Sequence, residues 1–229
     1  HVPLRAGRRV IDLRGLASLA AEHAEDLDHA VDPFRIGDRR FDTDSEPVVM
    51  GIVNLSTDSW YHSSISFSVD DAVRRGRVLA AQGAHVVDVG AESVVDTAER
   101  VGVQRQVDQL VPVVEGLVAA DVPVSVESYH PTVVEACLAA GASVLNLTGS
   151  TDDDAMFGLA AEHGASVVLC HIVGDHARDL ADPAVRRVAT DPFPEMGEQF
   201  ARRLEAARAA GVDSVAIDPG VGFGFSWLP

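Results

Sequence analysis

The chain has 229 residues, 47% of them apolar and 23% charged, a composition that supports a folded core and excludes a disordered protein. Its formal net charge of −17 opposes any hold on nucleic-acid phosphates, so we expect no nucleic-acid partner. No apolar run reaches the about 18 residues of a membrane span, and residues 1–30 lack the apolar centre of a signal peptide. We therefore expect a cytoplasmic protein that binds no membrane.

The basic residues are all arginine, so the chain carries neither a Schiff-base lysine nor the lysine of a phosphate-binding loop. The nine histidines form no HxH or HExxH spacing, and Cys137 and Cys170 lie in apolar stretches without a CxxC spacing. We therefore expect no nucleotide cofactor, no zinc and no disulfide, and we expect both cysteines to be buried.

The first 45 residues are richer in charge than the rest and contain one helical stretch over 15–29. The segment FRIGDRRFDTD that follows predicts a short hairpin turning at Gly37 and Asp38. We therefore expect an N-terminal extension, residues 1–45, that caps the bottom of a main domain over residues 46–229.

A pattern recurs through the main domain, in which an alanine-rich stretch ends on glycine and a β-branched stretch follows. Its copies are AAQGAHVVDVG (80–90), LAAGASVLNLTG (138–149), AEHGASVVLCHI (161–172) and AAGVDSVAIDPG (209–220). Glycine after a helix can adopt the left-handed conformation, so these glycines are predicted helix ends. With the apolar runs at 48–54 and 123–128, the pattern predicts six strands.

Helical periodicity fills the gaps between these strands. The predicted helices cover 68–82 with Ser68 as N-cap, 103–118, 131–140, 152–162 and 194–210. Strict alternation of strand and helix predicts a parallel sheet, either a closed (β/α)8 TIM barrel or an open doubly wound sheet. Only six βα units are visible, so we expect further chain or a partner to pair the open strand edges.

In parallel α/β folds the ligand meets the carboxyl ends of the strands. The polar residues that end the apolar runs are Asn54, Asp88, Glu92, Glu127, Asn146, His171 and Asp218. Carboxylates and amides without a fixed cation suit a neutral heterocycle rich in N–H donors. For three of these residues a structural role is the alternative: Asp88 orients its neighbours, Glu92 pairs with an arginine at the rim, and His171 is a core histidine. The run Asp152 to Asp154 is predicted to begin a helix.

The order of these motifs resembles the dihydropteroate synthases and their pterin-binding relatives, from about Val48 to Phe225. The similar segments are MGIVNLSTDSW (50–60) to N-x-T-P-D-S-F, DVGAES (88–93) to D-x-G-G-E-S, VSVES (124–128) to I-D-T, LNLTGS (145–150) to I-N-D-x-S-G, LCHIVG (169–174) to M-H-M-x-G and DPGVGFG (218–224) to D-P-G-x-G-F-G-K. The resemblance implies a (β/α)8 barrel that joins a hydroxymethyl-dihydropterin diphosphate to p-aminobenzoate and releases pyrophosphate with the help of Mg²⁺.

Carried over by position, the resemblance implies a pterin pocket of Glu127, Asn146 and Asp218, with Asp88, Glu92 and His171 as further substrate contacts. Asn54 is implied for the diphosphate and the metal, and Asp58 and Ser59 for the phosphate loop. The implied partners are a pterin and an arylamine. The oligomeric state stays open, with a homodimer among the alternatives.

The chain departs from the family pattern in several of these motifs. Glu127 replaces the aspartate of I-D-T, Val94 to Asp96 replace T-R-P, Leu147 replaces the aspartate of I-N-D, and Phe225 replaces the last lysine. These departures leave two alternatives to a synthase: a paralogue that binds a pterin-like ligand or a partner without this activity, and a pterin-dependent methyltransferase. The methyltransferase fits the pocket but not the DPGVGFG and DSW segments.

Overall fold

The computed structural model describes residues 12–27, 29–56, 65–66, 68–93, 98, 100–149, 152–172, 174, 176 and 193–220. The chain divides into two compact units, residues 1–32 and 33–229. In the first unit, α1 (Leu13–Glu22) and α2 (Ala24–Leu27) stand where the sequence predicts one helix. Asp12 caps α1, because its carboxylate accepts a hydrogen bond from the Gly15 N–H at 2.8 Å. The predicted boundary between residues 45 and 46 stays a prediction.

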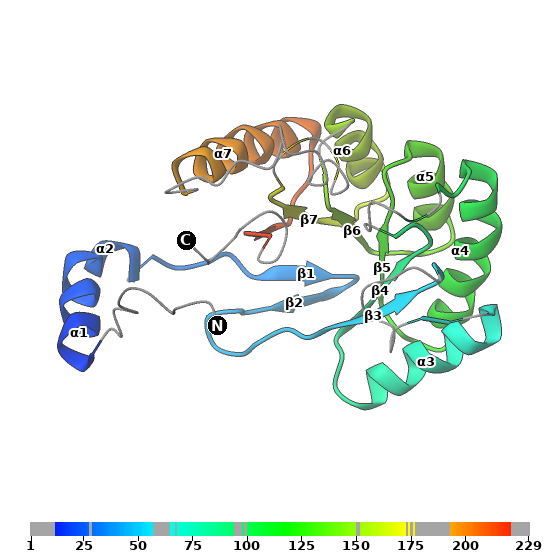
Figure 1. Cartoon of the computed structure of the whole chain (residues 1–229), viewed down its shortest axis with the longest axis horizontal. Coiled ribbons are helices and arrows are strands. Elements are labelled where there is room, and N and C mark those ends of the chain that lie inside the picture. The colour runs from blue at the N-terminus through cyan, green and yellow to red at the C-terminus, as the bar shows by residue number, and fades with distance from the viewer. Residues whose placement is uncertain are drawn as a thin grey trace, which may run out of the picture. The chain divides into compact units, whose positions relative to one another are not determined.

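Six parallel strands form the sheet of the second unit, and their order in space is their order in the chain (Figure 1). They are β3 (Met50–Asn54), β4 (Val86–Gly90), β5 (Val124–Glu127), β6 (Val144–Leu147), β7 (Ser166–Cys170) and β8 (Val215–Asp218). All six predicted strands are confirmed. The arrangement matches part of the predicted (β/α)8 barrel, of which the described residues supply six strands and the five helices between them.

Five helices follow the strands and cover one face of the sheet, which we call the outer face (Figure 1). They are α3 (Val69–Ala81), α4 (Val103–Val118), α5 (Pro131–Ala139), α6 (Asp153–Glu162) and α7 (Phe193–Ala210). Ser68 caps α3 as predicted, accepting a hydrogen bond from the Asp71 N–H at 3.1 Å. The glycines of the recurring pattern have the expected positive φ, from 61° at Gly164 to 107° at Gly141. No helix in the described part of the chain is both long enough and apolar enough to cross a membrane.

The outer face of each strand is apolar. Side chains such as Val87, Val124 and Leu145 are fully buried against the helices. Residues alternate between faces along a strand, so their neighbours Val86 and Val144 point to the opposite, inner face. There these two valines pack in a second, smaller apolar cluster.

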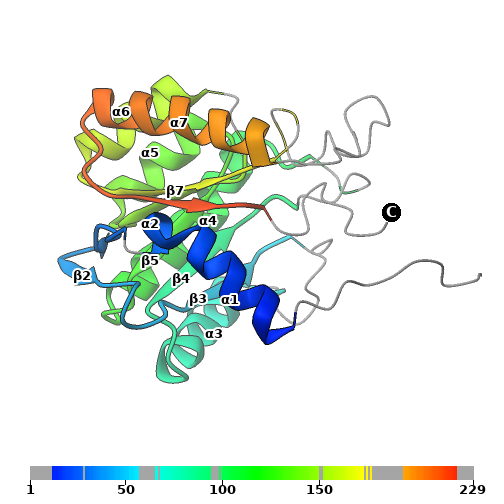
Figure 2. The same cartoon turned by 90° about the vertical axis from the view of Figure 1, so that its left-hand side faces the viewer.

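The predicted hairpin completes that second cluster. Strands β1 (Phe34–Ile36) and β2 (Arg39–Phe41) pair antiparallel around the turn at Gly37 and Asp38. Ile36 and Phe41, 1% and 3% exposed, pack on the inner-face residues at the amino ends of β4 and β6. Figure 2 shows the hairpin at one end of the sheet, away from the tips of the strand arrows. The hairpin thus closes the bottom of the sheet and leaves the carboxyl end for other groups.

Candidate functional site

The predicted site residues gather at the carboxyl end of the sheet. Asn54, Glu127 and Asp218 are the last residues of β3, β5 and β8. The strand register places Asn54 beside Gly90, Gly90 beside Glu127, and Glu127 beside Asn146. Asp218 pairs with Cys170, which stands two residues after Val168, the partner of Asn146. Residues paired across parallel strands share a face, so these four polar side chains point to the inner face around one mouth.

Asp88 lies one layer deeper on the same face and is only 6% exposed. Its carboxylate accepts hydrogen bonds from the Ser125 hydroxyl at 2.6 Å and from Asn146 Nδ2 at 3.2 Å. Burial raises the pKa of Asp88, and these two donors oppose that shift. The geometry favours an orienting role for Asp88. Its carboxylate holds the Nδ2 atom of the Asn146 amide, so Oδ1 is the other polar atom of that amide.

Glu127 is held from one side and approached closely on the other. Its Oε1 accepts a hydrogen bond from the Thr148 hydroxyl at 2.6 Å. Its Oε2 lies 3.1 Å from the point where a Cβ on Gly90 would stand, and Asn54 Oδ1 lies 3.7 Å from the same point. Burial, together with the charges of Asp88 and Glu92, raises the pKa of Glu127 to about 7, while the Thr148 hydrogen bond lowers it.

Asp218 is fixed by the chain that follows it. Its Oδ1 accepts a hydrogen bond from the Gly220 N–H at 2.8 Å, and burial and the nearby Asp218 carboxylate raise the pKa of the Cys170 thiol. Gly220 has a φ of 69°, and a Cβ there would stand 1.9 Å from the carbonyl oxygen of His171. Only glycine fits this turn.

Glu92 lies at the rim and is paired as the structural alternative predicts. Arg100 Nη1 lies 3.3 Å from its Oε1, and Gln106 Nε2 donates to its Oε2 at 2.9 Å. Gln106 in turn accepts a hydrogen bond from the Ser128 hydroxyl at 3.1 Å. This set of contacts ties the segment after β4 to the segment after β5.

His171 is 3% exposed and its Nδ1 is hydrogen-bonded to Gln199 of α7. Its ring also contacts Phe200 edge to face, with centroids 6.1 Å apart. These contacts agree with the core-histidine alternative. Both cysteines are buried, as the sequence predicts.

A buried cation lies close to the mouth, although the sequence suggested none. Arg203 of α7 donates to both oxygens of Asp153 at 2.8 Å and to the carbonyl oxygens of Gly149 at 2.6 Å and Cys170 at 3.3 Å. Asp153 is the first residue of α6, as predicted. Its ion pair with Arg203 was not predicted from the sequence. All three nitrogens of the guanidinium are engaged, so Arg203 fastens the ends of β6 and β7.

Two further side chains that sequence reasoning missed are Thr148 and Tyr129. The Tyr129 hydroxyl lies 2.7 Å from Thr148 Oγ1. Its ring stacks on His176, with centroids 3.7 Å apart and an angle of 21° between the planes. Thr148 and Tyr129 each stand two residues after a predicted site residue, Asn146 and Glu127. Continuing the strand alternation by one step would have found both.

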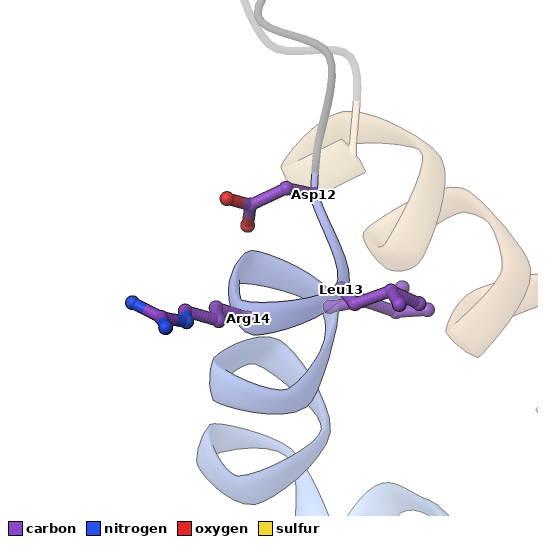
Figure 3. Close-up of a pocket in the computed structure, with 4 residues that line it drawn as sticks. Asp12, Leu13 and Arg14 are labelled. Carbon is purple, nitrogen blue, oxygen red and sulfur yellow. The ribbon is translucent and has the colours of Figure 1, made fainter.

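Asp58 and Ser59 lie outside the described residues, as do Val94 to Asp96 and the chain after Gly220. A separate hollow beside α1 is lined by Asp12, Leu13, Arg14 and Leu16. Figure 3 shows Leu13 and Arg14 pointing to opposite sides of the helix, with the Asp12 carboxylate at its start. None of the predicted site residues that the structure describes lines it.

The mouth therefore presents mainly oxygen acceptors. These acceptors are Glu127 Oε2, Asn146 Oδ1 and the Asp218 carboxylate. Each belongs to a side chain that a hydrogen bond within the protein holds in place. Such a set can bind several N–H donors on one edge of a flat ligand. Within the described ranges, no group of three or more His, Cys, Asp or Glu side chains could hold a metal ion.

Comparison with known proteins gives a consistent picture. The sequence profile of the pterin binding enzyme family matches residues 50–226. Dihydropteroate synthase of Synechocystis sp. is 29% identical over 202 residues, which cover 86% of this chain and 68% of that protein.

Solved structures agree with the sequence match. Dihydropteroate synthase from Thermus thermophilus in complex with 4-aminobenzoate is 34% identical, with a TM-score of 0.69 over 85% of this chain and 68% of that one. The enzyme from Xanthomonas albilineans in complex with 7,8-dihydropteroate is 32% identical, with a TM-score of 0.66 and coverage of 85% and 68%. The chain thus spans about two thirds of the length of these relatives. On these matches, the chain belongs to the family of pterin-binding enzymes that includes the dihydropteroate synthases.

Proposed function

We propose that the protein is a dihydropteroate synthase, which joins a hydroxymethyl-dihydropterin diphosphate to p-aminobenzoate and releases pyrophosphate. The observation that carries this proposal is the meeting of acceptor oxygens from Glu127, Asn146 and Asp218 at one mouth. The amino-pyrimidinone edge of a pterin offers several N–H donors in one plane, which matches such a set. Relatives solved with 4-aminobenzoate and with 7,8-dihydropteroate support the same substrates.

The roles proposed for individual residues follow from their contacts. Glu127, Asn146 and Asp218 bind the pterin, and Asp88 keeps the Asn146 amide turned so that its oxygen faces the ligand. The arylamine attacks the pterin methylene as the diphosphate leaves, so the protein positions the reactants and stabilises charge without a covalent nucleophile. Asn54, Asp58 and Ser59 are proposed for the diphosphate, and Glu92 and His171 for the walls of the pocket.

Magnesium fits this site as a ligand shared between protein and substrate. Mg²⁺ prefers oxygen ligands and is commonly held by one or two protein groups plus substrate phosphates, so a full protein cage is not required. Asn54 Oδ1, which lies 3.7 Å from the point where a Cβ on Gly90 would stand, is a suitable protein oxygen. When bound, the ion would neutralise charge on the departing diphosphate.

The second candidate is a paralogue that binds a pterin-like ligand without synthase activity. It is favoured by Glu127 in place of the family aspartate and by Leu147 in place of an acid. In this case the free pterin binds better than its diphosphate ester, because the two arginines described near the mouth, Arg100 and Arg203, are already paired with Glu92 and Asp153. A cytoplasmic location and a homodimer stay predictions for either candidate.

The experiment that separates the two candidates combines turnover with calorimetry. Pyrophosphate release is measured with the pterin diphosphate, p-aminobenzoate and Mg²⁺, and binding of the free pterin and of its diphosphate is measured with and without Mg²⁺. A synthase releases pyrophosphate and binds the diphosphate more tightly with Mg²⁺, and Asn54→Ala removes that advantage. Tight binding of free pterin without any turnover would instead support the paralogue.

A further inference from the structure

The two oxygens of the Glu127 carboxylate have different surroundings. Oε1 faces β6 and accepts the Thr148 hydroxyl at 2.6 Å. Oε2 faces β4, where the missing side chain of Gly90 leaves room for it, and Asn54 Oδ1 approaches the same space. Glu127 is thus held across the strands by one oxygen, with the other directed over Gly90.

Thr148 is itself held by a second hydroxyl. Tyr129 lies with its hydroxyl 2.7 Å from Thr148 Oγ1 and 3.3 Å from the Thr148 carbonyl oxygen. An ionised Glu127 can only accept, so Thr148 donates its single hydrogen to Oε1 and accepts one from Tyr129. A protonated Glu127 donates to Thr148, which donates to Tyr129, which donates to the Thr148 carbonyl. The contacts persist in both protonation states but are stronger with the ionised carboxylate, because the hydrogen bond from Thr148 is then charge-assisted.

The support of Tyr129 extends to the rim. Its ring stacks on His176, and Arg100 Nη1 lies 3.1 Å from His176 Nε2 and 3.3 Å from Glu92 Oε1. Segments after β4, β5 and β7 thus fix the position of Tyr129. This is the arrangement expected where one carboxylate must be held in one orientation.

We propose that Thr148, supported by Tyr129, is a positioning residue that occupies one oxygen of Glu127 and leaves the other as a single acceptor for the ligand. The longer glutamate thereby presents one oxygen above Gly90 instead of two parallel oxygens. This inference rests on the proposed function for its ligand, a pterin, whereas the contact itself is testable in the protein alone.

Several charged groups act on Glu127 besides this contact. Asp88 on β4 and Glu92 after it raise the pKa of Glu127, and Thr148 lowers it. Burial raises the pKa of the Cys170 thiol on β7, and the charges of Asp218 on β8 and of Glu127 itself raise it further. These neighbours are unchanged by substitutions at Thr148, so a change in titration after such a substitution reports the hydroxyl alone.

The test is a carbon-13 NMR titration of the Glu127 carboxyl group, assigned by its absence in Glu127→Gln. Loss of one charge-assisted hydrogen bond in Thr148→Val raises the midpoint by about one pH unit. Thr148→Ser keeps the hydroxyl and returns the midpoint towards the original value. Thr132→Val, on the exposed start of α5, serves as the matched control and leaves it unchanged. Tyr129→Phe gives a smaller upward shift and keeps the proposal testable if Thr148→Val does not fold.

Binding of 6-hydroxymethylpterin is measured by calorimetry over the same pH range. In the original protein the affinity for 6-hydroxymethylpterin rises with pH as Glu127 ionises. In Thr148→Val this rise occurs at a higher pH, by the same number of pH units as the shift of the titration midpoint. An unchanged titration midpoint in both Thr148→Val and Tyr129→Phe overturns the positioning role. A shifted midpoint in a protein that binds no pterin at any pH supports the positioning role and overturns the proposed function.

Discussion

On the outer face of the sheet the strands carry only apolar residues and glycine, whereas on the inner face β3, β6 and β8 change from apolar to polar side chains towards their carboxyl ends. Val144 and Asn146 of β6 show the change within one strand: the valine packs under the hairpin and the amide reaches Asp88. The outer face packs against helices, so its side chains need only a volume and shape that fill the space between sheet and helices. The inner face meets a hairpin at one end and a proposed ligand at the other.

The difference teaches how one strand can serve stability and binding at once. Neighbouring residues on a strand face opposite ways, so substitution of one leaves the other face almost untouched. Stability and ligand affinity should therefore respond to different residues, even when those residues are adjacent in the chain.

The strongest test of this separation is Leu145→Ala. Leu145 is fully buried on the outer face, and removing a buried leucine side chain costs about 3 to 4 kcal/mol of unfolding free energy. Urea unfolding measures the loss. Pterin affinity of the folded variant is expected to stay within about threefold of the original, a change of less than about 0.7 kcal/mol. A large loss of affinity would show that the two faces are not independent.

Asn146→Ala should give the converse result. It removes an acceptor from the mouth and a donor to Asp88, so pterin affinity should fall roughly 30-fold, or about 2 kcal/mol. Calorimetry measures the affinity and urea unfolding the stability. Equal losses of stability in Asn146→Ala and Leu145→Ala would remove the distinction between the faces.

The sequence was sufficient for the six strands and the helix ends because both depend on local signals. An apolar run, a glycine at a helix end and the hairpin turn at Gly37 and Asp38 can each be recognised within about ten residues of chain. The placement of Asn54, Glu127, Asn146 and Asp218 at one mouth followed from the rule that parallel strands share their carboxyl end.

Contacts between distant side chains were out of reach. Arg203 and Asp153 are 50 residues apart and meet only because α6 and α7 pack side by side. Ser125 reaches Asp88 through the register of β4 and β5, which no local pattern specifies. The sequence could therefore nominate Asp88 and Glu92 but could not name the partners that orient them.

In the sheet only the inner face carries charged side chains, and the third prediction concerns one of them, Glu127. The pKa of Glu127 is raised to about 7 in the folded protein, against about 4.3 for an ordinary glutamate side chain. Between these values the unfolded chain loses its proton first, so the stability contributed by Glu127 falls as pH rises. Glu127→Gln removes this effect and should be about 1 to 2 kcal/mol more stable than the original protein at pH 8, but not at pH 4.

Urea unfolding at both pH values measures that difference. Glu135→Gln, on the exposed side of α5, is the control and should change stability equally at the two pH values. A pH-independent difference for Glu127→Gln would mean that the carboxylate is not strained by its surroundings.

The smallest expected effect is also the most informative about how the inner face evolved away from the family pattern. Glu127→Asp restores the family residue but withdraws the carboxylate by one methylene, away from the Thr148 hydroxyl that holds it. If the longer side chain merely misplaces the carboxylate, this change should improve pterin affinity. We expect the opposite, a loss of about 1 to 1.5 kcal/mol of pterin binding free energy, because Thr148, Tyr129 and Gly90 are all arranged around the longer side chain.

Calorimetry with free pterin gives the sign of the change directly. The double variant Glu127→Asp with Thr148→Val should lose little more affinity than either single variant. A gain in affinity together with pyrophosphate release would show instead that the pocket still suits aspartate.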